Sequence, residues 1–208
     1  DDGVRTRRTD PGVSRHHSSK EIDEVALLES EWLYIEGGFL ASDSRFDLIK
    51  DVVSKAKGAG VKVALGLNGP KVDQAFLKNI WTVIDGGIDL ILGSRDEAVS
   101  HTQAFSLAEA CDILEGSVHM YAVTGGPQGT VVFDGQERFN VPQIPVDDVD
   151  ENGTVDMFAG AFLYAITAGY ELKWAAELAN ESAARVLEQY GPRLDAVEFE
   201  SIMQKFEI

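Results

Sequence analysis

Short apolar runs alternate with longer amphipathic stretches along most of the chain. Residues 32–36, 61–65 and 88–92 are nearly continuously apolar, which is typical of parallel strands covered on both faces. Between them, residues 42–57 and 74–84 place apolar side chains at helical spacing, and Gly58 and Gly60 mark the end of the first helix. This alternation predicts βαβ units, and therefore an α/β fold with a mostly parallel sheet.

The second half of the chain adds a hairpin and a run of helices to this pattern. Asp134-Gly135 lies between two short apolar segments and is a favourable hairpin turn. No internal repeat or low-complexity linker interrupts the chain, so we predict a single domain over residues 1–208. The further predicted elements are helices at 96–101 and 107–115, strands at 118–124, 129–133 and 138–141, and helical stripes at 153–169, 174–187 and 197–206.

Composition narrows the possible functions. The chain has 208 residues, 44% of them hydrophobic, which is enough to build a core. Its formal net charge of -17 argues against a nucleic-acid partner, because such surfaces neutralise phosphates with basic patches. Cys111 is the single cysteine and is predicted to be a buried helical thiol. No apolar run reaches a membrane span, so we expect a cytoplasmic protein with no membrane partner.

A polar, glycine-containing turn stands directly before the apolar helix that begins near residue 153. The first backbone N–H groups of a helix lack partners and the helix dipole is positive there, so this arrangement predicts an anion site. Asp156 falls in the first turn. Its carboxylate has two interpretations: a favourable charge at a helix N-terminus, or a general base beside a bound phosphate.

The run from Asp150 to Phe162 reads DENGTVDMFAGAF. It resembles the C-terminal motif of the PfkB or ribokinase-like kinases, Asp-Thr-x-Gly-Ala-Gly-Asp followed by an Ala/Phe-x-Gly-x-Phe helix. The resemblance extends over nearly the whole chain, is closest to the branch of adenosine kinases and bacterial sugar kinases, and includes residues 31–37 and 180–186 in the expected order. It implies a ribokinase-like three-layer α/β/α sandwich. It also implies an ATP-dependent, Mg²⁺-requiring phosphotransferase that acts on a hydroxyl of a small-molecule sugar or nucleoside.

The same resemblance assigns roles to the residues of the motif. Asp156 corresponds to the general base that removes the proton from the acceptor hydroxyl. Gly153, Thr154 and Val155 correspond to the anion hole that holds the transferred phosphate. This division of labour is physically reasonable, because phosphoryl transfer is catalysed mainly by alignment and charge stabilisation.

Further positions are assigned to the nucleotide and the metal. Thr124, Gly126 and Gly129 match a nucleotide-binding turn, although the same residues also suit a tight turn that leads into the hairpin. Asn180 matches a residue near the adenine, and is otherwise interpreted as a solvated polar side chain. Glu97 matches a residue that holds Mg²⁺ through its water shell, or is a favourable charge at a helix start.

The chain also departs from the family pattern. It starts inside that pattern, so we expect the N-terminal strands, the lid and much of the acceptor pocket to be missing, and a homodimer or partner chain to cover the exposed sheet edge. Thr154 and Val155 replace anion-hole glycines, Gly66 replaces the usual Asp, and Ser94 replaces an Asn. These changes leave an alternative: a catalytically weakened or silent module that serves as a nucleotide-binding or assembly partner.

Overall fold

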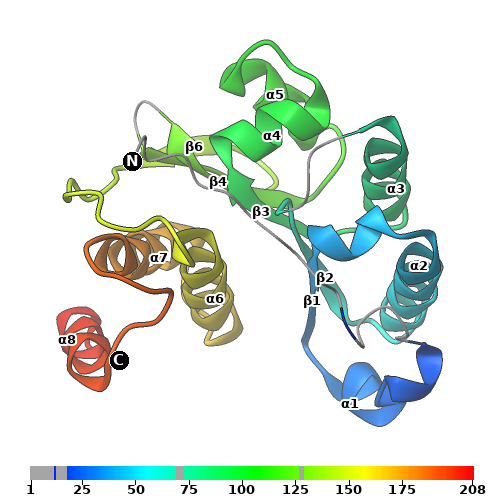
Figure 1. The fold of residues 1–208 in the computed structure, drawn as a ribbon, viewed down its shortest axis with the longest axis horizontal. Coiled ribbons are helices and arrows are strands. Elements are labelled where there is room, and N and C mark those ends of the chain that lie inside the picture. The colour runs from blue at the N-terminus through cyan, green and yellow to red at the C-terminus, as the bar shows by residue number, and fades with distance from the viewer. Residues whose placement is uncertain (1–11, 13–17, 69–72, 127–128) are drawn as a thin grey trace.

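A single six-stranded sheet forms the centre of the molecule. The computed structural model describes residue 12 and residues 18–68, 73–126 and 129–208. The strands are β1 (Trp32–Glu36), β2 (Lys62–Gly66), β3 (Leu90–Ser94), β4 (Met120–Gly126), β5 (Gly129–Phe133) and β6 (Arg138–Val141). Their spatial order equals their chain order (Figure 1). Strands β1 to β4 are parallel to one another, and β5 is antiparallel to both of its neighbours, β4 and β6. The predicted, mostly parallel sheet is confirmed.

Helices cover both faces of this sheet. The α-helices of the described residues are α1 (Glu24–Glu29), α2 (Asp43–Gly58), α3 (Gln74–Asp85), α4 (Arg95–Thr102), α5 (Leu107–Glu115), α6 (Thr154–Thr167), α7 (Leu172–Leu187) and α8 (Ala196–Phe206). The layer of α2 to α5 packs on one face and the layer of α6 to α8 on the other (Figure 1). No helix in the described part of the chain is both long and apolar enough to cross a bilayer.

Alternating side chains of the strands pack into two separate cores. In β3, Ile91 belongs to the core beneath α2 to α5, whereas Leu90 and Leu92 belong to the core beneath α6 and α7. All three are buried, which explains why this strand has three apolar residues in a row. Cys111 is buried in the first core, as predicted. The three-layer α/β/α arrangement is therefore confirmed.

The parallel strands end at a common edge. Glu36 at the end of β1 pairs with Gly66 at the end of β2, and Ser94 at the end of β3 pairs with Thr124 near the end of β4. In parallel sheets with helices on both faces, ligands bind beyond the carboxyl ends of the strands. This carboxyl edge is where the predicted site residues of β3 and β4 lie.

Three short elements were not predicted from the sequence: η2 (Ser19–Glu21), α1 and η3 (Gly37–Ala41). Helix α1 has only six residues and buries only Leu27, so it shows no helical periodicity in the sequence. The side chain of Asp23 accepts a hydrogen bond of 3.0 Å from the amide of Ala26 and caps this helix. Local capping and tertiary contacts, rather than an amphipathic pattern, define these elements.

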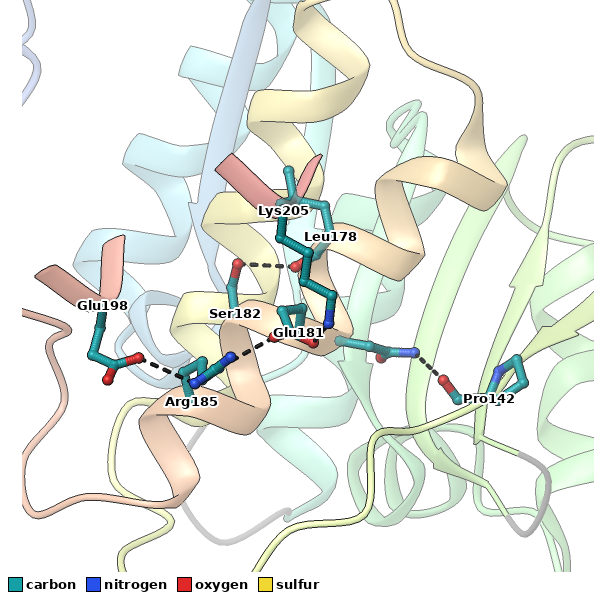
Figure 2. Close-up of polar contacts among 8 residues, drawn as sticks. Pro142, Leu178, Glu181, Ser182, Arg185, Glu198 and Lys205 are labelled. Atoms are coloured by element: carbon teal, nitrogen blue, oxygen red, sulfur yellow. Dashed lines mark hydrogen bonds and ion pairs between the residues drawn. The ribbon is translucent and has the colours of Figure 1, made fainter. Parts of the chain in front are cut away.

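Helix α8 is tied to α7 by a buried carboxylate. The side chain of Glu181 on α7 is 2% exposed. Its Oε1 accepts a hydrogen bond from Nε of Arg185 (3.1 Å), and its Oε2 accepts one from Nζ of Lys205 on α8 (2.7 Å) (Figure 2). Nη1 of Arg185 also contacts Oε2 of Glu198 on α8, at 3.3 Å. A buried carboxylate needs such partners, and here they come from both helices.

Glu181→Gln should therefore lower the free energy of unfolding by about 1–3 kcal/mol, because the amide oxygen can accept only one of the two hydrogen bonds and the negative charge that faces both cations is lost. The two cations are partly exposed, which keeps the loss below that of a fully buried pair. Urea unfolding measures the change. Glu177→Gln is the matched control, because this exposed glutamate lies one turn earlier on α7. An equal effect of both substitutions would contradict the role of Glu181.

Candidate active site

A glycine in a left-handed conformation is the N-cap of α6. Gly153 is the N-cap, with φ 84° and ψ -2°, and no side chain caps this end of the helix. A Cβ at this position would lie 2.4 Å from Cβ and 2.7 Å from Cα of Pro192. Both the backbone conformation and the close approach of residue 192 therefore require glycine here. The predicted helix N-terminus is present, with its first turn available to an anion.

Thr154 and Val155 occupy the first two positions of α6. Both are half-buried and line the same cavity. The Oγ1 of Thr154 is buried and has no hydrogen-bond partner among the described residues. A buried hydroxyl normally has a partner, so this atom is a hydrogen-bond donor that a bound anion could use. Thr154 therefore adds a polar group as well as bulk at the first position of α6.

The cavity beside these residues has a volume of about 390 Å³. It is enclosed by the end of β4, the segment that leads out of β6, and the helices α6 and α7. It brings together four of the sequence-predicted site residues, namely Thr124, Thr154, Val155 and Asn180. The other lining residues are Gln143, Ile144, Pro145, Val146, Asp148, Phe158, Ala183, Ala184 and Leu187.

Asn180 borders this cavity but is not a solvated polar residue. It is 6% exposed, and its Oδ1 accepts a hydrogen bond of 2.6 Å from Oγ1 of Thr130. Its Nδ2 donates to the carbonyl oxygens of Pro142 (3.0 Å) and Val141 (3.4 Å). The solvated interpretation of Asn180 was wrong, because these partners lie far away in the sequence and give no periodic signal.

The glycines that follow Thr124 shape the connection between β4 and β5. Gly126 pairs with Gly129 across the two strands, and a register shift separates this pair from Val123. Gly129 has φ 105°, and a Cβ there would lie 2.1 Å from the carbonyl oxygen of Val141. The backbone of the next segment thus packs directly on Gly129, which agrees with the tight-turn interpretation. The predicted turn also contains residues 127–128, which lie outside the described residues.

Glu97 closes a capping box at the start of α4. Its Oε2 accepts hydrogen bonds from the backbone N–H (2.8 Å) and Oγ (3.0 Å) of Ser94, and its own amide donates to Oγ of Ser94 (3.3 Å). These contacts agree with the interpretation of Glu97 as a favourable residue at a helix start. Within the described residues, no group of three or more His, Cys, Asp or Glu side chains forms a ready-made metal site.

Asp156 lies on the exposed face of the first turn of α6. It lines a second cavity of about 400 Å³ with mostly apolar residues of α6, α7 and α8. Thr154 and Val155 face the first cavity, so the carboxylate and the anion-binding positions lie on adjacent sides of the same turn.

Tyr34 is a site residue that sequence reasoning missed. Burial, followed by the negative charges of Asp156, Glu36 and Glu97, raises the pKa of Tyr34 to about 12. A Cβ at Gly66 would lie 2.3 Å from the Tyr34 hydroxyl oxygen, so this hydroxyl fills the space of the absent side chain at position 66. The alternation of β1 predicts which face Tyr34 is on, but not that it reaches across β2.

Together, these features define an α/β/α protein with a cavity and an uncapped helix N-terminus at the carboxyl edge of its sheet, the edge where such folds bind ligands. Comparison with known proteins identifies the family. The model of the pfkB family of carbohydrate kinases matches residues 1–198, and the chain belongs to this family.

Individual relatives agree with this assignment. The chain is 29% identical to the cytidine kinase of Thermococcus kodakarensis over 138 residues (64% of this chain, 49% of the relative). It is 26% identical to the adenosine kinase of Saccharomyces cerevisiae over 202 residues (90% of this chain, 59% of the relative). The structure of a probable sugar kinase from Rhizobium etli has a TM-score of 0.85 at 25% identity and covers 93% of this chain and 59% of that one. The chain thus spans about half to three-fifths of the length of these relatives.

The glycine at the N-cap of α6 allows a sharp test of the site's backbone. Gly153→Ala should lower the free energy of unfolding by roughly 2–4 kcal/mol, because alanine is strained at positive φ and would clash with Pro192. Gly160→Ala on the same helix is the matched control, since nothing lies within 4 Å of its added Cβ. It should raise stability by about 0.5–1 kcal/mol. Urea unfolding of both variants checks the opposite signs.

Proposed function

We propose that this protein transfers the γ-phosphoryl group of ATP to a hydroxyl of a sugar or nucleoside. The observation that carries the proposal is the first turn of α6. It joins an uncapped helix N-terminus at Gly153, an unpartnered buried hydroxyl on Thr154 and an exposed carboxylate on Asp156. Phosphoryl transfer needs this combination of anion stabilisation and one carboxylate that directs the nucleophile.

In this proposal the helix N-terminus holds the transferred phosphate. The amide of Thr154 already donates to the carbonyl oxygen of Glu151 at 3.3 Å, so the donors to the phosphate oxygens are the backbone N–H groups of Val155 and Asp156 and the hydroxyl of Thr154. The helix dipole favours the developing negative charge. Asp156 accepts the proton of the acceptor hydroxyl. As that proton leaves, the oxygen forms a bond to the γ-phosphorus, the bond from the phosphorus to the bridging oxygen breaks, and ADP departs.

The nucleotide occupies the cavity between α6 and α7. This cavity has a volume of about 390 Å³, which is within the range of small-molecule sites, and it borders the start of α6. Thr124, at the end of β4, stands where it can contact the phosphate chain, and Gly126 and Gly129 shape the turn beside it. Asn180 also lines the cavity, and we assign it to the part that holds the base.

Mg²⁺ would neutralise the charge of the phosphates when bound. The capping box engages Oε2 of Glu97, which leaves Oε1 for the water shell of the ion. Asp156 and Glu97 both raise the pKa of Tyr34, so the two carboxylates act on the same edge of the sheet. Because its pKa is raised, the hydroxyl of Tyr34 stays neutral, and in this proposal it donates a hydrogen bond to the acceptor or the phosphate.

A second candidate function is nucleotide binding with little or no turnover, as a binding or assembly partner. Val155 favours it, because this β-branched side chain lines the cavity at the predicted anion hole and restricts the approach of a phosphate. The two functions differ in one measurement. Both predict that Mg-ATP raises the melting temperature, whereas only the first predicts release of ADP that depends on an acceptor.

The base is tested by Asp156→Asn in a coupled ADP-release assay with adenosine, inosine, ribose and fructose as acceptors. The substitution should lower kcat by roughly 10²–10⁴-fold while leaving the melting shift with Mg-ATP in place. Asp96→Asn is the control, since Asp96 is an exposed aspartate in the first turn of α4 and should have no effect. Full activity of Asp156→Asn would disprove the mechanism. A melting shift without turnover in the unsubstituted protein would establish the second function instead.

The role of Glu97 in metal binding can be separated from its role in capping. Glu97→Gln keeps an acceptor for the capping box and removes the charge, so stability should change by less than about 0.5 kcal/mol while the Mg²⁺ concentration for half-maximal activity rises several-fold. Ser94→Ala should do the reverse: lose about 1 kcal/mol of stability and keep the Mg²⁺ dependence. An unchanged Mg²⁺ dependence in Glu97→Gln would assign this residue to the cap alone.

A further inference from the structure

One wall of the nucleotide cavity is an extended segment without secondary structure. Residues 142–148, here called the strap, follow β6 and contribute five of the residues that line the cavity, from Gln143 to Asp148. Within the described part of the chain, no backbone–backbone hydrogen bond joins residues 143–148 to another element. The position of this wall must therefore be set where the strap begins and ends.

The beginning of the strap is held by a buried side chain of α7. Nδ2 of Asn180 donates to the carbonyl oxygen of Pro142 at 3.0 Å (Figure 2) and to that of Val141 at 3.4 Å. Two carbonyl acceptors require the amide nitrogen on this side, so Oδ1 faces the other way, where Oγ1 of Thr130 donates to it at 2.6 Å. Thr130 is fully buried, and this bond fixes the orientation of the amide.

Gly129 completes this first attachment. A Cβ there would lie 2.8 Å from both the Cα of Pro142 and the amide nitrogen of Gln143, so the strap lies directly on the backbone of β5. The end of the strap is held by α7 again, because the amides of Val149 (2.9 Å) and Asp150 (3.2 Å) donate to the carbonyl oxygen of Leu187. One helix therefore fixes both ends of the cavity wall.

We propose that Asn180 and Thr130 are positioning residues for the nucleotide, and that they act by fixing the strap rather than by contacting the ligand. The inference rests on the proposed function, because the ligand of this cavity is the ATP proposed above. Both amide hydrogens of Asn180 are engaged by the carbonyl oxygens of Val141 and Pro142, and its Oδ1 already accepts a hydrogen bond from Thr130, so the side chain has no donor left for the base. Thr130 has 0% exposure and cannot touch a ligand.

The experiment compares Asn180→Asp with Thr130→Val. Asn180→Asp keeps the size and the acceptor for Thr130 but replaces the donor to the strap by a carboxylate oxygen. Thr130→Val keeps the shape and removes the hydroxyl that orients the amide. Both should raise the Kd of Mg-ATP by about tenfold or more, the effect of losing one good hydrogen bond. Both should leave the Kd of Mg-tripolyphosphate within about twofold, because this probe needs only the α6 N-terminus.

Two controls separate positioning from general damage. Ser182→Ala removes a buried hydroxyl of the same turn of α7, which among the described residues donates only to the carbonyl oxygen of Leu178 in its own helix (Figure 2). It should leave Mg-ATP binding unchanged. Thr130→Ser retains the hydroxyl and should bind Mg-ATP like the unsubstituted protein. If Asn180→Asp does not fold, Thr130→Val carries the test alone.

A ligand-free measurement tests the attachment itself. Proteinase K, with the first cleavage located by mass spectrometry, should cut within residues 142–148 about tenfold faster in Asn180→Asp and Thr130→Val than in Ser182→Ala. Unchanged cleavage in both variants overturns the proposal. So does weaker Mg-ATP binding in Asn180→Asp together with normal binding in Thr130→Val, because that result assigns Asn180 to direct contact. An unsubstituted protein that binds no Mg-ATP overturns the proposed function, and the cleavage rates then still decide whether these residues hold the strap.

Discussion

The turn of α7 at residues 180–184 is buried on every side, and this constraint organises the C-terminal helical layer. A helix turn in that position cannot carry an unpartnered polar side chain, because burial without hydrogen bonds is costly. Each of its polar residues has a different partner. Asn180 binds the strap, Glu181 binds the cations of α7 and α8, and Ser182 binds the carbonyl of Leu178.

The attachments made by Asn180 and Glu181 link features that are distant in the sequence. The cavity wall, the C-terminal helix and the start of α6 all depend on where α7 lies against β5 and β6. Removing the charge of Glu181 and removing the donor of Asn180 should therefore have different consequences, although the residues are neighbours. The first loosens α8 and lowers stability, whereas the second moves a wall of the cavity and changes ligand affinity.

The sequence was sufficient to predict the strands, the longer helices and the helix N-terminus at Gly153, because these depend on periodicity and on one glycine. It was not sufficient for α1, whose six residues bury a single side chain. It also could not predict the partners of Asn180, since Thr130 lies fifty residues away and only the fold brings them together. The capping box of Glu97 can be recognised in the sequence, because Ser94 and Glu97 have the required spacing.

Thr154 and Val155 fit the backbone of the first turn of α6 without conformational strain. Among the described residues, positive φ occurs outside glycine only at Gln103 and Glu207, so Thr154 and Val155 do not occupy the left-handed region. The left-handed position is Gly153, where glycine is retained. β-Branched residues are therefore compatible with the backbone of the site. The two residues have opposite effects on phosphate binding at this helix end. The side chain of Val155 takes space from the cavity, whereas the hydroxyl of Thr154 adds a hydrogen-bond donor.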